Sequence, residues 1–458
     1  PFLKQQMEER IAAGETAESA ADNVCQFFME MFAGTGDELM EQRASDVKDI
    51  RDDLLGILLG VKRTDLAAVP KGSILVASDF TPSMTGRINR ENVVGIIAEV
   101  GGVTSHSAIL ARAMDLPAVL SVEGATAKIE NGRPLILDGM NGYIYPDPSE
   151  EEIASYAALQ KEYEAEKESL KKFATLPTVT ANGVQKAVYG NIGKPEDVQN
   201  VVQHGGEGIG LFRTEFLFMD RSLEPTEEEQ FEAYSTVAKA MHGKEVIIRT
   251  LDVGGDKDIP YLSIEKEENP FLGFRAIRYC LKNTALFKRQ LRAILRASAY
   301  GNVKIMLPLV TCVEEIRSAK ALVDECAAEL NAEGQTIKEV PVGIMVETPA
   351  AALTSDLLAK EAAFFSIGTN DLTGYIMAVD RGNAKVADLY HVMQPAVLKA
   401  IEMTIKSAKA AGIPVGMCGE AAADPALTGK LLQWGLDEFS VSPSSILKTR
   451  KAILEQNA

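Results

Sequence analysis

Three runs of sequence decide the fold: KIMLPLV at residues 304–310, VGIMVET at residues 342–348 and PVGMCGE at residues 414–420. Each is a short, mostly apolar segment, and long amphipathic segments such as residues 313–330 and 395–411 stand between them. Continuous apolar runs that alternate with helical patterns indicate parallel strands joined by crossover helices. The sequence therefore predicts an α/β fold.

The alternation of strand and helix patterns occurs eight times between about Ala187 and the end of the chain. The predicted strands are residues 188–192, 208–216, 246–253, 304–310, 342–348, 364–371, 414–420 and 438–442. Eight such units over this length match the usual size of a (β/α)8 barrel, about 250 residues. A doubly wound open sheet is the alternative, because periodicity by itself does not prove that the sheet closes.

Three further segments precede this barrel. We predict a partial helical subdomain at residues 1–62, a compact α/β domain at residues 63–146, a helical linker at residues 147–177 and the barrel at residues 178–458. The linker helix should begin after Ser149, because Ser149 and Glu152 have the spacing of a capping box. We place the boundary between two mobile parts of the molecule in this linker.

Composition and charge exclude several classes of protein. With 46% apolar and 24% charged residues, the chain is expected to be globular. The net charge of −18 disfavours nucleic acid and anionic membrane surfaces as partners. We expect a cytoplasmic protein, because no segment resembles a membrane span or a signal peptide. The five cysteines include no Cys-x-x-Cys pair, which argues against a disulfide framework or a zinc site.

Charged and polar residues follow the predicted strands, at the end of a barrel where active sites form. They are Arg213 and Glu215, Arg249 and Asp252, Glu347, Asn370 and Asp371, and Cys418 and Glu420, with Arg275 and Arg381 in the segments between. Several arginines on one rim make an anion site, because guanidinium is planar, always charged and bidentate toward phosphate or carboxylate.

Two other chemistries are indicated at the same rim. Glu347 and Asp371 offer two hard oxygen ligands for Mg²⁺, or they are carboxylates held only by the surrounding arginines. Cys418 could transfer a proton with a thiol pKa modulated by nearby cations, or it is a buried and inert cysteine.

A second candidate site surrounds His106, in the sequence GGVTSHSAILAR at residues 101–112. Two glycines and several hydroxyl residues put this histidine at the expected start of a helix, where free N–H groups and the helix dipole favour an anion. A phosphoryl group on His106 would be stabilised there, although a histidine that only caps the helix is the simpler interpretation. His204, His242 and His391 lack such surroundings, and we interpret them as structural.

Several longer motifs then point to a known family. They are the His106 segment, GIGLFRTEFLFM at residues 208–219, RTLDVGGDK at residues 249–257, ENPFLGFR at residues 268–275, VETPA at residues 346–350, GTNDL at residues 368–372, VDRGN at residues 379–383 and GMCGE at residues 416–420. Together they closely resemble the phosphoenolpyruvate-protein phosphotransferases, the enzyme I family of the bacterial sugar phosphotransferase system. The resemblance covers nearly the whole chain and implies a TIM barrel beside a swivelling phosphohistidine domain.

The resemblance also implies roles for individual residues. His106 would take the phosphoryl group from phosphoenolpyruvate, with Mg²⁺ held by Glu347 and Asp371, and would pass it to the carrier protein HPr. Cys418 would protonate the enolpyruvate carbon as pyruvate forms. The substrate would be bound by Arg213, Arg249, Arg275, Asn370 and Arg381.

Two departures from the family pattern concern the chain ends. The family has an upstream segment, which contributes helices to the HPr-docking subdomain, and it continues with further helix beyond Ala458. We therefore expect this chain alone to be impaired in docking HPr, and the homodimer that the family forms through its barrel to be affected.

Two other functions share features of this sequence. A pyruvate-phosphate dikinase or phosphoenolpyruvate synthase shares a similar histidine segment and barrel, but it needs an ATP-binding domain that this sequence does not contain. A non-catalytic sensor of phosphoenolpyruvate would keep the arginines and lose the nucleophile, yet His106 is present.

Overall fold

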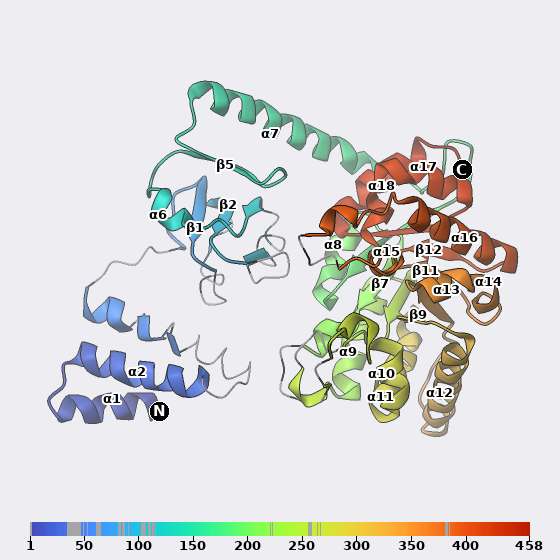
Figure 1. The fold of residues 1–458 in the computed structure, drawn as a ribbon, viewed down its shortest axis with the longest axis horizontal. Helices are drawn as coiled ribbons and strands as arrows, with labels where there is room; N and C mark the ends of the chain where they lie inside the picture. Colours follow the sequence, from blue (N-terminus) through green and yellow to red (C-terminus); the bar gives the residue numbers. More distant parts are fainter. Residues whose placement is uncertain are drawn as a thin grey trace. The chain divides into compact units, whose positions relative to one another are not determined.

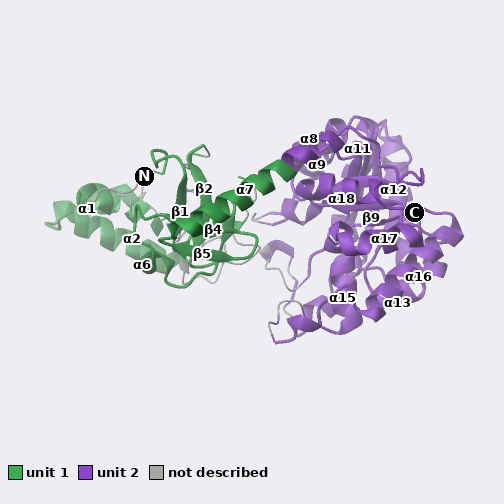
Figure 2. Cartoon of the chain, turned by 90° about the horizontal axis from the view of Figure 1, so that it is seen from above, with its two compact units in different colours: residues 1–166 green, residues 167–458 purple. Residues whose placement is uncertain are grey.

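The computed structural model describes most of the chain as two compact units, residues 1–166 and residues 167–458 (Figure 2). It leaves undescribed residues 1, 34–46, 49, 53, 61–65, 81–83, 85–87, 90, 102–106, 109–110, 112–113, 115, 220, 222, 255–258, 263, 266, 381–382 and 384. No helix in the remaining residues is both long enough and apolar enough to cross a membrane.

The second unit is built on a closed barrel of parallel strands, which confirms the predicted TIM barrel and excludes the open sheet. Its strands are β6 (Ala187–Ile192), β7 (Gly208–Arg213), β8 (Glu245–Arg249), β9 (Asn302–Leu307), β10 (Val342–Val346), β11 (Phe365–Ile367), β12 (Val415–Met417) and β13 (Glu438–Val441). They follow one another around the barrel in sequence order, and β13 closes it by pairing with β6.

Helices surround this barrel (Figure 1). They are α8 (Val198–Gln203), α9 (Glu227–Ala240), α10 (Ala276–Lys282), α11 (Thr284–Ala297), α12 (Val313–Ala332), α13 (Pro349–Leu353), α14 (Ser355–Leu358), α15 (Thr369–Met377), α16 (Pro395–Ala411), α17 (Pro425–Trp434) and α18 (Ile446–Leu454). Several predicted strands were too long at their C-terminal ends. The backbone there turns into loops or short helices, such as η3 (Thr214–Leu217) after β7.

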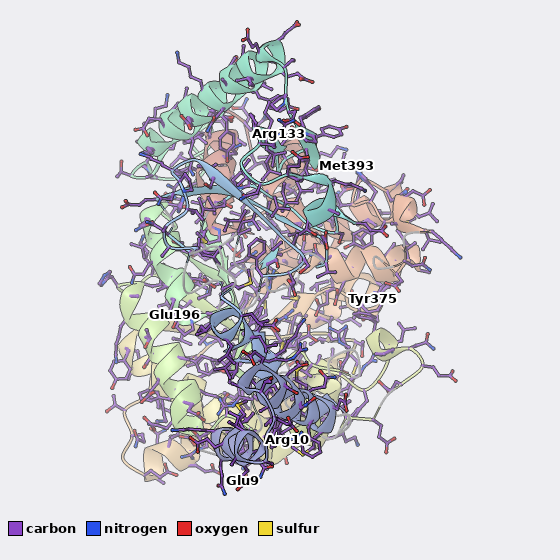
Figure 3. All side chains as sticks on the ribbon, turned by 90° about the vertical axis from the view of Figure 1, so that its left-hand side faces the viewer. Glu9, Arg10, Arg133, Glu196, Tyr375 and Met393 are labelled. Carbon is purple, nitrogen blue, oxygen red and sulfur yellow. The ribbon has the colours of Figure 1, made fainter. Side chains whose placement is uncertain are left out.

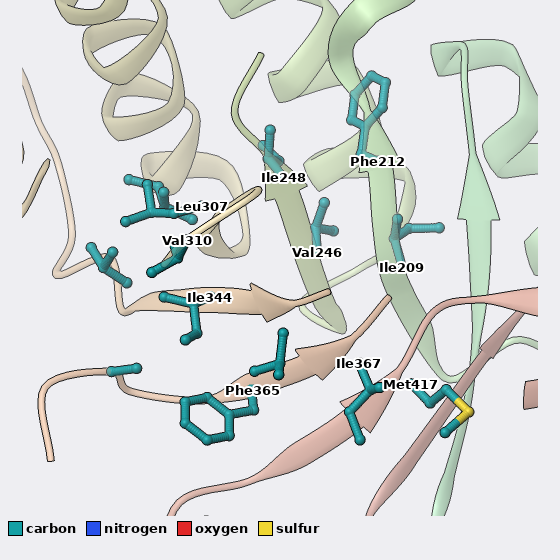
Figure 4. Close-up of a cluster of buried hydrophobic side chains, with 14 of the residues drawn as sticks. Ile209, Phe212, Val246, Ile248, Leu307, Val310, Ile344, Phe365, Ile367 and Met417 are labelled. Atoms are coloured by element: carbon teal, nitrogen blue, oxygen red, sulfur yellow. The ribbon is translucent and has the colours of Figure 1, made fainter. Parts of the chain in front are cut away.

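Alternating residues of the strands build two separate apolar cores. Residues that face outward, such as Phe212, Ile248 and Ile344, pack against the helices in the large core of the unit (Figure 4). Their neighbours along the strands face inward and form a smaller cluster of Leu211, Ile247, Met306, Met345, Phe364 and Cys418. Because successive side chains of a strand point to opposite faces, this pattern also fixes which strand-end residues enter the barrel interior.

The described part of the first unit contains helices, a small parallel sheet and an antiparallel hairpin. Helices α1 (Phe2–Ala12) and α2 (Ala17–Ala33) pack together, and a parallel sheet is formed by β1 (Ser73–Ala77), β2 (Val93–Ala98) and β3 (Ala118–Val119). Strands β4 (Leu135–Asp138) and β5 (Tyr143–Pro146) form the antiparallel hairpin, and α6 (Ala125–Lys128) precedes it. Residues 73–146 thus contain several short strands.

The long helix α7 (Glu150–Leu170) follows this hairpin and begins at the predicted capping box. The backbone N–H of Ser149 donates to Glu152 at 2.7 Å, and the N–H of Glu152 donates to the Ser149 hydroxyl at 3.3 Å. The helix ends at Leu170, which is 4% exposed, and a 3₁₀ turn, η1 (Lys171–Phe173), follows it.

Candidate active site

Two arginines stand side by side where β7 and β8 end. Arg213 is the last residue of β7 and Arg249 the last of β8, and the two are register partners in the parallel ladder. Each lies two residues beyond a member of the inner cluster, Leu211 and Ile247, so the strand alternation points both arginines to the inside of the barrel. Arg213 is in contact with solvent, but the protein atoms around its guanidinium still desolvate it and so lower its pKa, and the charge of Arg249 lowers that pKa as well.

Arg249 is held by two buried carboxylates. Its Nη2 lies 3.0 Å from Oε1 of Glu215, and its Nη1 lies 3.2 Å from Oδ2 of Asp252. Burial alone would lower the pKa of Arg249, but the charges of Glu215 and Asp252 outweigh it and raise that pKa. The Nε of Arg249 is buried and has no hydrogen-bond partner among the described residues.

Arg275 joins the same network from the start of α10. Its Nη2 lies 2.7 Å from Oδ1 of Asp252 and 3.7 Å from Oδ2 of Asp371, and its guanidinium also stacks over the ring of Phe271. Its Nη1 is buried without a partner in the described part of the chain. Two arginines that each retain an unused N–H donor can bind an oxyanion, because charge-assisted hydrogen bonds to phosphate or carboxylate are strong.

Glu347 lies close enough to Asp371 for the negative charge of Asp371 to act on the ionisation of Glu347. Glu347 directly follows β10 and is 2% exposed, and one of its oxygens accepts a hydrogen bond from the N–H of Leu309 at 2.7 Å. Burial, together with the negative charge of Asp371, raises the pKa of Glu347 to about 8. Gly368 makes room for this carboxylate, since an added Cβ would lie 2.9 Å from its Oε2.

This pair of carboxylates fits a divalent cation. A cation between them would relieve the repulsion that raises the pKa of Glu347, and Mg²⁺ takes one or two carboxylates and fills its other positions with water and phosphate oxygens. No group of three or more His, Cys, Asp or Glu side chains in the described residues could hold a metal. Two carboxylates leave the other octahedral positions of Mg²⁺ to water and ligand oxygens.

Asp371 and Asn370 lie in the first turn of α15 and not at the end of a strand, which corrects the prediction of a strand through residue 371. The side-chain oxygen of Asn370 accepts the N–H of Glu420 at 3.1 Å, and the Tyr390 hydroxyl donates to its backbone carbonyl at 2.8 Å. These bonds fix the start of α15 beside the end of β12. The predicted rim residues from these two elements are thus neighbours.

Cys418 follows β12 and belongs to the inner cluster of the barrel. It is 3% exposed, and burial raises the pKa of its thiol to about 12, although the nearby Ser366 hydroxyl opposes the shift. Burial, and not the nearby cations that the sequence suggested, dominates this pKa. The side chain is a protonated thiol at neutral pH, which can donate a proton.

Two predicted site residues, His106 and Arg381, lie outside the described residues. The histidines that we interpreted as structural have ordinary surroundings. The His204 ring is hydrogen-bonded to the carbonyl of Asn200 at 2.7 Å, and that of His391 accepts the N–H of Met393 at 3.0 Å.

Sequence reasoning missed two residues that support the rim. Gln290 of α11 accepts the N–H of Leu251 at 2.9 Å and donates to the Thr214 hydroxyl at 3.1 Å, which links the ends of β7 and β8. A glutamine on the buried face of an amphipathic helix was the signal that could have identified it. Tyr375 of α15, labelled in Figure 3, donates to the carbonyl of Phe271 and so ties α15 to the segment before Arg275.

Comparison with known proteins identifies the family. Residues 167–458 match the PEP-binding domain of the PEP-utilising enzymes, and residues 69–142 match the mobile domain of the same enzymes. The chain belongs to the phosphoenolpyruvate-protein phosphotransferases of this family. The resemblance seen in the sequence motifs is thus confirmed.

The curated relatives in this family extend over nearly all of the chain. The phosphoenolpyruvate-protein phosphotransferase of Priestia megaterium is 48% identical and covers 95% of this chain and 76% of its own length. That of Bacillus subtilis (strain 168) is 46% identical and covers 99% of this chain and 80% of its own length. Among solved structures, a solution structure of Enzyme I is 32% identical, covers 36% of this chain and 66% of that chain, and has a TM-score of 0.32.

Proposed function

We propose that this protein transfers the phosphoryl group of phosphoenolpyruvate to His106, releases pyruvate and passes the phosphoryl group on to the HPr carrier of the sugar phosphotransferase system. One observation carries the proposal. Arg213 and Arg249 are paired at adjacent strand ends, and Arg249 and Arg275 each keep a buried N–H without a partner among the described residues. Such a set of donors suits a small ligand with several negative charges.

In the proposed reaction the barrel arginines bind and orient the substrate. Arg213, Arg249, Arg275 and Arg381 hold its phosphate and carboxylate, and Asn370 contacts it from α15. The bond between phosphorus and the enol oxygen breaks as a bond from an imidazole nitrogen of His106 to phosphorus forms. The arginines stabilise the charge of the loose transition state, so catalysis rests on positioning and neutralisation.

Cys418 completes the release of product. Its thiol gives a proton to the terminal carbon of the enolpyruvate, which becomes pyruvate, and the thiolate takes a proton back from solvent. The raised thiol pKa keeps this proton in place at neutral pH. The inner position of Cys418, on the same side of the strands as Arg249, is consistent with this role.

Glu347 and Asp371 would hold Mg²⁺ in the working enzyme. When bound, this ion supplies positive charge to the phosphate oxygens. Asp371 itself also orients Arg275, through the 3.7 Å contact with its Nη2.

The proposed cycle needs His106 to meet both the barrel rim and HPr. We propose residues 1–62 as a partial HPr-binding subdomain, residues 63–146 as the phosphohistidine domain, residues 147–177 as the linker and residues 178–458 as the substrate-binding barrel. We further propose a cytoplasmic homodimer that associates through the barrel.

Labelling with ³²P-phosphoenolpyruvate and Mg²⁺ tests the function directly. We expect an acid-labile, base-stable label on the wild-type protein and none on the His106→Ala variant, because phosphohistidine has this stability and the variant lacks the acceptor. His204→Ala is the matched control, since that ring bonds only to a helix carbonyl among the described residues, and it should label normally. Label on His106→Ala equal to that of wild type would overturn the proposal.

The same preparation distinguishes the dikinase and sensor functions. ATP labelled at the β or γ position should leave the protein unlabelled, whereas a dikinase or synthase would transfer label from it. A sensor would bind phosphoenolpyruvate and release no pyruvate.

A further inference from the structure

Asp252 is a buried carboxylate that no step of the proposed reaction uses. It lies three residues after Arg249, just beyond the end of β8, and is 4% exposed. Burying a carboxylate is costly unless it is paired with charged donors. In this case both of its oxygens are paired with arginines of the candidate site.

Each carboxylate oxygen of Asp252 contacts a different arginine. Oδ2 lies 3.2 Å from Nη1 of Arg249, and Oδ1 accepts from both Nη2 and Nε of Arg275 at 2.7 and 3.2 Å. The backbone N–H of Asp252 donates to Oε1 of Glu215 at 3.1 Å, and that same oxygen accepts Nη2 of Arg249. Asp252 is thus fixed at both its backbone and its side chain.

This arrangement determines which donors stay unused. In Arg249 both Nη atoms contact carboxylates and Nε does not. In Arg275, Nε and Nη2 contact the carboxylate of Asp252 and Nη1 does not. Both remaining donors are buried without a partner among the described residues. A shared carboxylate also offsets the repulsion that would otherwise drive two neighbouring guanidiniums apart.

We infer that Asp252 is a positioning residue that holds Arg249 and Arg275 together, so that Nε of Arg249 and Nη1 of Arg275 are presented to one anionic substrate. This inference rests on the proposed function and adds a residue to it. Asp252 acts through the two arginines, and its loss should therefore weaken substrate binding more than it slows the chemical step.

The test compares Asp252→Asn with Asp252→Glu and a control variant. The amide of asparagine keeps the size of the side chain but carries no charge and can accept at only one atom. We expect the phosphoenolpyruvate concentration for half-maximal labelling of His106 to rise by about 10- to 100-fold, and the maximal rate to fall less. Asp252→Glu restores the charge and should recover most of the affinity.

Glu224→Gln is the control, because Glu224 pairs with Arg289 elsewhere in the same unit. It should leave half-maximal labelling unchanged and should lower the melting temperature less than Asp252→Asn does, because the Glu224–Arg289 pair is partly exposed. A purely structural Asp252 would instead lower the melting temperature and the amount of labelled protein at an unchanged half-maximal concentration, which overturns the inference.

If Asp252→Asn does not fold, the positioning role of Asp252 can be tested in the wild-type protein. In ¹⁵N spectra of its arginine side chains, we expect two guanidiniums with slow Nε–Cζ rotation whose signals both shift on addition of phosphoenolpyruvate. Only one shifted signal, or none, would overturn the inference even though His106 still labels. Absence of label on the wild-type protein would instead reject the proposed function.

Discussion

The pKa of Cys418 gives a prediction at the scale of one residue. Burial raises that pKa to about 12, so the thiol should remain protonated over the range in which the enzyme works. We expect pyruvate formation to show no loss from thiol ionisation up to about pH 10, and Cys418→Ala to slow protonation of the enolpyruvate by about 100-fold. Pyruvate release measured against pH checks both points.

Labelling of His106 separates the role of Cys418 from that of the arginines. Phosphoryl transfer precedes protonation in the proposed order, so a single round of labelling should survive in Cys418→Ala. Loss of label together with loss of pyruvate would contradict the assignment of Cys418 as the proton donor.

The raised pKa of Glu438 predicts how the free energy of unfolding depends on pH. It lies at the start of β13 in the barrel interior, where added Cβ atoms at Gly210 and Gly416 would collide with its carboxylate. Burial and the charge of Glu245 raise its pKa to about 8, although Lys304 opposes the shift. The folded protein therefore prefers this carboxyl protonated, and it loses stability as the pH rises from about 4.5 to about 8.

Glu438→Gln should remove this loss, since the amide stays neutral. We expect the free energy of unfolding to rise on the order of 1–3 kcal/mol at pH 9 and to change little at pH 5. Chemical unfolding at the two pH values measures this difference. Glu196→Gln, at an exposed residue labelled in Figure 3, should change neither value. Equal effects of Glu438→Gln at both pH values would show that the carboxyl does not titrate in this range.

At the scale of the elements, Arg450 of α18 anchors the segment that follows α7. Its side chain is fully buried and donates to the carbonyls of Phe173, Ala174 and Gly205 at 2.9, 3.1 and 2.6 Å. It also donates to the hydroxyl of Thr178 at 3.0 Å. No local sequence pattern indicates these contacts, because the two segments are more than 270 residues apart.

Removing this anchor should destabilise the second unit. Arg450→Met keeps the apolar stem and leaves buried carbonyls without donors, at about 1–3 kcal/mol each, so we expect a loss of about 3 kcal/mol or more. Unfolding of the second unit in denaturant measures it. Arg317→Met, which breaks an exposed pair with Glu361, should leave that transition unchanged. Equal transitions for the two variants would contradict the anchoring role of Arg450.

At the scale of the whole molecule, the sequence predicted which segments form strands and helices better than it predicted where the strands end. Apolar runs near Ile344 and Met417 mark strands that do lie in the barrel, because only a buried parallel strand tolerates such continuous hydrophobicity. The predicted strands continued too far at their C-terminal ends. Polar residues that follow a strand can continue its alternating pattern, so the pattern does not show where the strand stops. Helix starts with a capping box, as at Ser149, were located well, because a cap is a local hydrogen-bond pattern.

By itself, the sequence determined the fold class, the family and the kinds of side chain at the rim of the barrel, because strand periodicity, helix caps and motif spacing are local. Only the tertiary structure decided that the sheet closes and that Arg249 and Arg275 share the carboxylate of Asp252. It also decided that burial governs the pKa of Cys418. Closure, shared ion pairs and desolvation depend on residues distant in sequence, which no local pattern records.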